Sequence, residues 1–249
     1  MSERMRSYLG PRLTPAQKRT LNRLRAIGHA GDLARLANVF ASDKEGGHHY
    51  TAHYDRHFRH LRHARLNILE IGIGGYDDPE VGGGSLRMWK AYFSRANVFG
   101  IDIYDKRPHD EPRIRTFQGS QVDEEFLRRV LEEIGSVDII IDDGSHLNEH
   151  VVETFRILFP LLSPSGIYVA EDLQTAYWEG GGWDGSNDLN APRTSMSLFK
   201  RLADGLNYEE FRVPGYEPTY TDRHVVGVDF YHNLAFITKG LNSEGSNVD

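Results

Sequence analysis

Four carboxylates follow two apolar runs near the middle of the chain. One pair, Asp142 and Asp143, ends a run that starts at Val137, and the other, Glu171 and Asp172, ends a second run. Both runs have the pattern of buried parallel strands, so their carboxyl ends should meet at one edge of a sheet, where open α/β proteins bind ligands. Four acidic side chains would repel one another there unless a cation or a substrate offsets their charge. The spacing therefore predicts a divalent-metal site.

A histidine stands beside this predicted site. His146 follows the second aspartate in the turn D-D-G-S-H, just before a segment with helical apolar spacing. Histidine is the side chain that most often transfers protons in enzymes, so His146 is the candidate general base. The alternative is a structural histidine near a helix start that only bonds a carboxylate.

A glycine-rich turn follows the first apolar strand, Leu66 to Ile71. Its residues Glu70, Gly72 and Gly74 form an E-x-G-x-G pattern, and such glycines let the backbone approach a ligand closely. The dinucleotide fingerprint G-x-G-x-x-G would require glycine where the chain has Asp77. The pattern is instead similar to the class I methyltransferase loop that wraps the methionine half of S-adenosyl-L-methionine. A tight turn without a ligand is the alternative.

Further cofactor contacts are expected along the same sheet edge. Asp102, at the end of the second strand, could accept hydrogen bonds from both ribose hydroxyls of an adenosine. Asp142 is expected to face the amine of the cofactor. The loop after the third strand lies where an adenine ring would sit, and it carries Gln118, Ser120 and Gln121.

Six of the twelve histidines lie between residues 48 and 63. A zinc site is disfavoured, because four ligands on one helix face cannot converge on one tetrahedral ion. We interpret this segment as a surface helix. The loop before it, from Lys44 to Tyr50, is expected to lie over the cofactor.

A glycine-rich, polar stretch without periodicity follows the second carboxylate pair. Loops of this kind are usually functional or disordered. Its position predicts that it folds over a substrate, with the aromatic contacts supplied by Tyr177, Trp178 and Trp183.

The alternation of strand and helix patterns predicts an α/β fold. We expect a doubly wound, mostly parallel sheet of the class I methyltransferase (Rossmann-like) type, ending in an antiparallel hairpin around residues 231–233. Residues 1–40 are predicted to be an N-terminal helical extension, 41–240 the methyltransferase domain and 241–249 a flexible tail.

The composition restricts the class of partner. The chain has 249 residues with 36 acidic and 29 basic side chains, a net charge of -7 that argues against nucleic acid. Without cysteine, disulfides, thiolate catalysis and zinc–thiolate sites are not available. No apolar run has the length of a membrane span, and no signal-peptide core is present, so a cytoplasmic protein without a membrane partner is expected.

The segments ILEIGIGG, FGIDIYDK, IIDDGSHLNEH and YVAEDLQTAYW together resemble the metal-dependent sugar O-methyltransferases of antibiotic biosynthesis, of the mycinamicin and demethylmacrocin type. The resemblance spans roughly residues 42–238. It implies S-adenosyl-L-methionine as the methyl donor and Mg²⁺ held by Asp143, Glu171 and Asp172, with His146 as the general base and Asp143 also in a catalytic role.

The resemblance also implies the acceptor. This would be a hydroxyl of a rhamnose-like deoxysugar on a glycosylated natural product. Larger members of the family carry an N-terminal oligomerisation domain, which about forty residues cannot form. A homo-oligomer is possible, and its size stays open.

Three other functions stay open on the sequence alone. A catechol-type or other small-molecule O-methyltransferase would use the same donor and metal. A nicotinamide-dependent oxidoreductase would share the strand order and Asp102 but not the glycine spacing. A non-catalytic binding protein would not depend on His146 for any activity.

Overall fold

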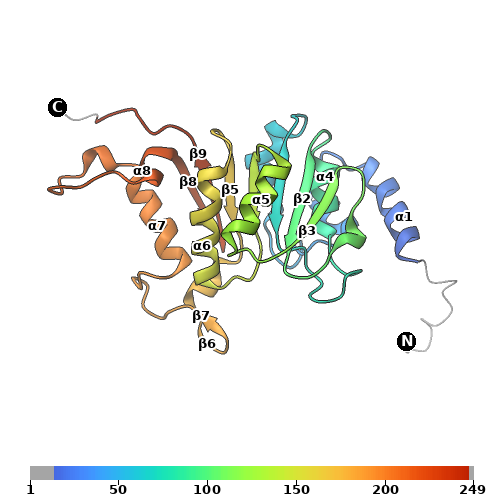
Figure 1. Ribbon diagram of the computed structural model, residues 1–249. Coiled ribbons are helices and arrows are strands. Elements are labelled where there is room, and N and C mark those ends of the chain that lie inside the picture. The colour runs from blue at the N-terminus through green and yellow to red at the C-terminus, as the bar shows by residue number, and fades with distance from the viewer. Residues whose placement is uncertain (1–13, 247–249) are drawn as a thin grey trace.

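A seven-stranded, mostly parallel sheet forms the centre of the fold (Figure 1). In the computed structural model, which describes residues 14–246, its strands lie in the order β3 (Ile114–Gln118), β2 (Asn97–Asp102), β1 (Asn67–Ile71), β4 (Ile139–Asp142), β5 (Ile167–Ala170), β9 (Leu234–Lys239) and β8 (Val225–Tyr231). Neighbours from β3 to β5 pair in parallel, whereas β9 pairs antiparallel with both β5 and β8.

Helices cover both faces of this sheet (Figure 1). One face is packed by α2 (Leu33–Phe40), α3 (Thr51–Phe58) and α4 (Gly84–Tyr92), with α1 (Pro15–Ile27) contacting α2 and α4. The other face is packed by α5 (Glu124–Ile134), α6 (Asn148–Leu158) and α7 (Ser195–Gly205). A short helix, α8 (Tyr220–His224), leads into β8.

The central strands are apolar because helices bury both of their faces. In β4, Ile139 and Ile141 face one core and Ile140 faces the other. A strand buried on both sides has a nearly continuous apolar sequence, which is why the apolar run alone located it. The polar exceptions, Glu70 in β1 and Asp142 at the end of β4, are both buried and therefore need partners.

The short elements lie mainly in the connections. A two-stranded hairpin, β6 (Glu179–Gly180) and β7 (Trp183–Asp184), projects beside the lower end of α6 in the view of Figure 1. The remaining short elements are 3-10 helices: η2 (Arg59–Leu61), η3 (Arg107–His109), η4 (Phe159–Leu161), η5 (Leu173–Tyr177) and η6 (Tyr208–Glu210).

The predicted fold class is confirmed. The chain order reverses between the adjacent strands β1 and β4, and a reversal of this kind marks the crevice outside the carboxyl ends of the strands where open α/β sheets bind ligands. The predicted C-terminal hairpin is β8–β9, and its turn contains Asn233 in the left-handed region, with φ at 60°.

The predicted N-terminal extension is integrated into the core at its second helix. Four residues of α2 are buried against α4 and the sheet. The predicted tail is anchored at Asn242, whose side chain donates to the carbonyls of Leu206 and Asp222. Residues 1–13 and 247–249 lie outside the described residues, and the domain division stays a prediction. Within residues 14–246 every helix is too short or too polar to cross a membrane.

Candidate active site

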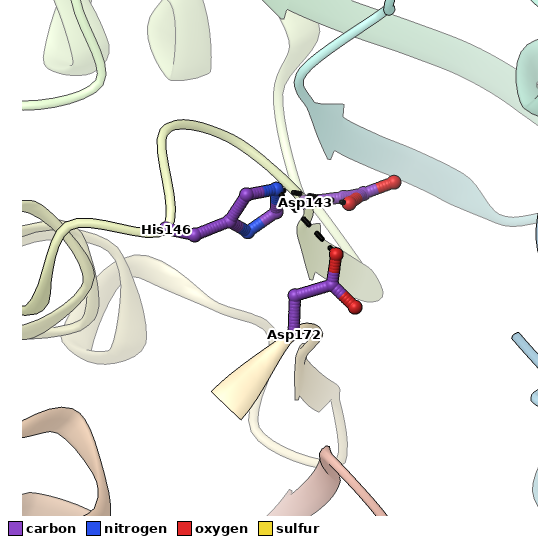
Figure 2. Close-up of side chains that lie close together, drawn as sticks. All are labelled: Asp143, His146 and Asp172. Atoms are coloured by element: carbon purple, nitrogen blue, oxygen red, sulfur yellow. Dashed lines mark ion pairs between the residues drawn. The ribbon is translucent and has the colours of Figure 1, made fainter. Parts of the chain in front are cut away.

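Three side chains converge at the carboxyl edge of the sheet. Asp143, His146 and Asp172 each offer one ligand atom, and these atoms lie within 4.8 Å of one another (Figure 2). The Nε2 atom of His146 is 3.8 Å from Oδ1 of Asp143 and 3.7 Å from Oδ2 of Asp172. All three side chains are partly exposed, so a solute can reach them.

Strand ends and a tight turn bring these residues together. Asp143 follows β4, and its amide donates to the carbonyl of Ile71, while Asp172 follows β5. His146 has a φ of 57°, in the left-handed region that residues other than glycine seldom adopt. The amide of Ser145 donates to Oε1 of Gln121, which holds the turn before the histidine in place.

The third predicted metal ligand is turned towards the protein interior. Glu171 is buried, and its Oε1 accepts hydrogen bonds from Lys44 Nζ at 2.5 Å and from the phenol of Tyr54. The three predicted metal ligands therefore differ in how far they are exposed. Asp143 and Asp172 meet His146 in the open cluster, and Glu171 lies behind them among these donors.

Lys44 is a buried cation among carboxylates. Its Nζ lies 2.7 Å from Oδ2 of Asp143 and 3.4 Å from Oε1 of Glu70, in addition to its contact with Glu171. Burial opposes the charged ammonium, but the neighbouring carboxylates outweigh it and hold the pKa of Lys44 above its ordinary value. The predicted loop over the cofactor is thus, at Lys44, part of the interior. The available signal was the need for a positive charge beside four converging carboxylates, but nothing in the sequence assigned that role to Lys44.

The other end of that loop contacts the same carboxylates. The phenol of Tyr50 donates to Oδ1 of Asp172 at 2.8 Å, and Nδ1 of His48 lies 3.4 Å from the same oxygen. The segment around Lys44 to Tyr50 therefore lies against the predicted metal ligands. The interpretation of the histidine-rich segment as a surface helix is only partly correct. Of its histidines, only His53 and His57 lie on α3, where both are half-buried, and Tyr54 on the same helix is fully buried.

The glycine turn after β1 adjoins the aspartate loop. Gly72 has a φ of 86°, and a Cβ atom added there would lie 1.9 Å from the carbonyl oxygen of Asp143. Only glycine fits this close approach. Gly74, with a φ of 77°, faces open space apart from a distant contact with Gly82. Glu70 accepts from Ser85 Oγ at 2.8 Å, and burial raises its pKa to about 7.

The predicted cofactor residues separate into two groups. Asp102 lies at the crevice, where its carboxylate accepts from the amides of Ile73 and Tyr104. Gln118 ends β3 and Ser120 follows it on the same edge. Gln121 and Asp142 are buried instead. Their side chains bond each other at 3.3 Å. These two residues lie beneath the aspartate loop.

The predicted substrate aromatics border the same region. Tyr177 and Trp178 are exposed, and Trp178 packs edge-on against Trp183 with ring centroids 5.2 Å apart. Asp184 follows Trp183 and anchors this hairpin to α6. Its two carboxylate oxygens accept from the amides of Asn148 at 2.7 Å and Glu149 at 2.8 Å. A residue distant in sequence thus caps the helix that begins two positions after His146, and no local sequence pattern indicated this contact.

Removing this cap should loosen the hairpin and the histidine turn together. We expect Asp184→Ala to lower the free energy of unfolding by about 1 kcal/mol, the usual cost of losing a helix N-cap. Hydrogen exchange of the amides of Asn148 and Glu149 should accelerate. Asp188→Ala is the matched control, because Asp188 lies in the same loop and its carboxylate accepts from the nearby amide of Asn190. Equal exchange rates in both variants would contradict the assigned cap.

Asp142 should make stability depend on pH. Burial raises its pKa to about 7, so the folded protein binds a proton there that the unfolded chain releases near pH 4. Stability is therefore lost as the pH rises through this window. The asparagine variant has no such proton. As the pH rises from about 5 to about 7, we expect the free energy of unfolding of Asp142→Asn to increase relative to that of the wild type by about 1–3 kcal/mol. Urea unfolding measures this difference. Parallel pH profiles would show that the carboxylate is ionised in the folded protein.

The sheet order, the glycine turn after β1 and the acidic edge define a class I methyltransferase fold. No protein-family model matches the sequence. Mycinamicin VI 2''-O-methyltransferase of Micromonospora griseorubida is 47% identical over 95% of this chain and 60% of its own length. Demethylmacrocin O-methyltransferase of Streptomyces fradiae is 52% identical over 86% of this chain and 54% of its own length.

A solved structure agrees with these similarities. A methyltransferase from the mycinamycin biosynthetic pathway, in complex with Mg and SAH, has a TM-score of 0.82 and 49% identity over 86% of this chain and 55% of that chain. The chain is similar in sequence and in structure to these O-methyltransferases, as its sequence motifs predicted. It spans more than half, but less than two thirds, of the length of the curated relatives it matches.

Proposed function

We propose that this protein transfers a methyl group from S-adenosyl-L-methionine to a sugar hydroxyl of a glycosylated natural product, with Mg²⁺ at the acceptor site. The observation that carries the proposal is the position of His146. Its imidazole faces two carboxylates at the carboxyl edge, beside the glycine turn of a class I methyltransferase fold. The acceptor class is supported by a further similar protein, the 8-demethyl-8-alpha-L-rhamnosyl tetracenomycin-C 2'-O-methyltransferase of Streptomyces olivaceus, whose name specifies a rhamnosyl acceptor.

The residues present fit a magnesium ion. Mg²⁺ prefers oxygen ligands, usually one or two carboxylates together with waters. Asp143 and Asp172 supply such oxygens at an open position. Glu171, which is buried beside Lys44, is the third candidate ligand. When bound, the ion would act as a Lewis acid that lowers the pKa of a coordinated sugar hydroxyl. His146 is then left as a proton acceptor, because its nitrogen is the poorest of these donors for so hard a cation.

The protein's own residues would hold the reactants and move one proton. The turn from Glu70 to Gly74 and Asp102 at the end of β2 would hold the two halves of the cofactor along the crevice. His146 would accept the proton of the attacking hydroxyl at Nε2, the nitrogen that faces both aspartates. Trp178 and Trp183 would contact the acceptor from the hairpin. Catalysis then rests mainly on positioning an in-line displacement.

The test is binding followed by turnover. S-adenosylhomocysteine should bind the metal-stripped protein, and methyl transfer to mycinamicin VI or a rhamnosyl tetracenomycin should require added Mg²⁺. A small diphenol should not be methylated. Turnover of the diphenol alone would favour a catechol-type enzyme. NAD binding would favour the nicotinamide-dependent oxidoreductase. Failure to bind S-adenosylhomocysteine would refute the proposal. A cytoplasmic location and a homo-oligomer stay predictions.

A further inference from the structure

Two phenols one helical turn apart face two consecutive acidic residues. Tyr50 stands immediately before α3 with a helical backbone, and Tyr54 follows four residues later on the same side of the helix. The phenol of Tyr50 donates to Oδ1 of Asp172 at 2.8 Å, and the phenol of Tyr54 donates to Oε1 of Glu171. The helical spacing of the tyrosines thus matches the adjacent acidic pair that follows β5.

These donors divide the carboxylate oxygens into two sets. Tyr50 contacts Oδ1 of Asp172, whereas Oδ2 is the atom that lies 3.7 Å from Nε2 of His146. Asp143 shows the same division, because Lys44 contacts its Oδ2 and His146 lies 3.8 Å from its Oδ1. One oxygen of each aspartate is anchored, and the other faces the open cluster. The anchoring groups all come from residues 44–54.

Packing fixes the tyrosines before any ligand binds. Both are buried, with exposed fractions of 3% for Tyr50 and 0% for Tyr54. The ring of Tyr54 packs edge-on against Trp89 and Phe236, with centroids 4.9 and 5.3 Å apart. A phenol held in this way offers one hydrogen in a fixed direction, so it restricts the rotation of the carboxylate that accepts it.

We propose that Tyr50 and Tyr54 are positioning residues that orient Asp172 and Glu171 for the divalent cation, an inference that rests on the proposed function. Groups that hydrogen-bond metal ligands set their orientation, and their loss typically weakens metal binding by about 10–100-fold. Neutral phenols allow a clean test. Their removal leaves the charge of the site unchanged, so a change in affinity reports the orientation of the ligands.

The experiment is a calorimetric titration of Mg²⁺ into metal-stripped protein, with S-adenosylhomocysteine binding measured in parallel. Tyr50→Phe and Tyr54→Phe should each raise the Kd for Mg²⁺ by about 10–100-fold. Tyr54→Phe should leave cofactor binding unchanged, because Tyr54 is fully buried and lies outside the loop expected to cover the cofactor. Tyr92→Phe is the matched control. Its phenol donates to Oδ1 of Asp55 at 2.7 Å, so it loses an equivalent bond to a carboxylate outside the cluster. Its Kd for Mg²⁺ should equal that of the wild type.

A double substitution tests whether Tyr50 affects Mg²⁺ affinity through Asp172. If Tyr50 acts through Asp172, Tyr50→Phe should change the Mg²⁺ affinity of an Asp172→Asn background by less than about twofold, because the two effects are not independent. Unchanged Mg²⁺ binding in both single tyrosine variants would overturn this inference and leave the proposed function intact. Absence of Mg²⁺ binding by the wild type would overturn the metal part of the proposed function and this inference with it.

Discussion

Replacing His146 is expected to lower methyl transfer by about 10²–10⁴-fold, the range that a positioned general base contributes. The affinity for S-adenosylhomocysteine should be unchanged, because His146 lies on the loop after β4 and faces the aspartates rather than the glycine turn. The loss should therefore appear in kcat. The measurement is methyl transfer to mycinamicin VI under saturating Mg²⁺ and cofactor.

The choice of substitution matters at this position. His146 has a left-handed backbone, which alanine tolerates poorly and asparagine tolerates better. His146→Asn should therefore remove the base while keeping the turn, and His146→Ala should add a small loss of stability. His150→Ala is the control, since His150 bonds the hydroxyl of Ser145 on the same turn. Full activity of His146→Asn would favour a protein in which the imidazole has only a structural role.

Replacing Lys44 with methionine is expected to have the largest effect on stability, a loss of about 3–5 kcal/mol. The ammonium is completely buried and contacts Asp143, Glu171 and Glu70. Methionine fills a similar volume but leaves buried carboxylates without a counter-charge, and this uncompensated charge is the source of the cost. Urea unfolding of the metal-free protein measures it.

The loss of stability in Lys44→Met should grow as the pH rises. Without the lysine, the buried carboxylates are more stable protonated, so their folded pKa values lie above the unfolded ones and stability falls as the pH rises towards them. The double variant Lys44→Met/Glu171→Gln should recover part of the loss. Lys239→Met is the control, because Lys239 is also buried but donates to the carbonyls of Phe159, Pro160 and Leu162. If both lysine variants show the same pH profile, the carboxylate cluster is not what Lys44 stabilises.

The sequence by itself determined the fold class and the location of the acidic edge. Buried parallel strands are apolar throughout, so their ends are visible wherever a run such as Val137 to Ile141 meets an aspartate. Gly72 was likewise identified from the E-x-G-x-G pattern, and the structure supplies the reason for the glycine, because a Cβ atom there would collide with the backbone of the aspartate loop. Asp143 and His146 share one short turn, which is a local feature, whereas their approach to Asp172 also requires β4 and β5 to be neighbours in the sheet.

Only the tertiary structure decided which partners the carboxylates have. Lys44 and Tyr54 reach Glu171 across separations of 127 and 117 residues, and no local pattern specifies such contacts. The same holds for Asp184, which caps α6 from 36 residues away. Buried charges must find counter-charges and helix ends must find acceptors, but these requirements do not say which residue meets them. That choice depends on how the helices pack against the sheet, and it separates the inward-facing Glu171 from the two aspartates that face the open site.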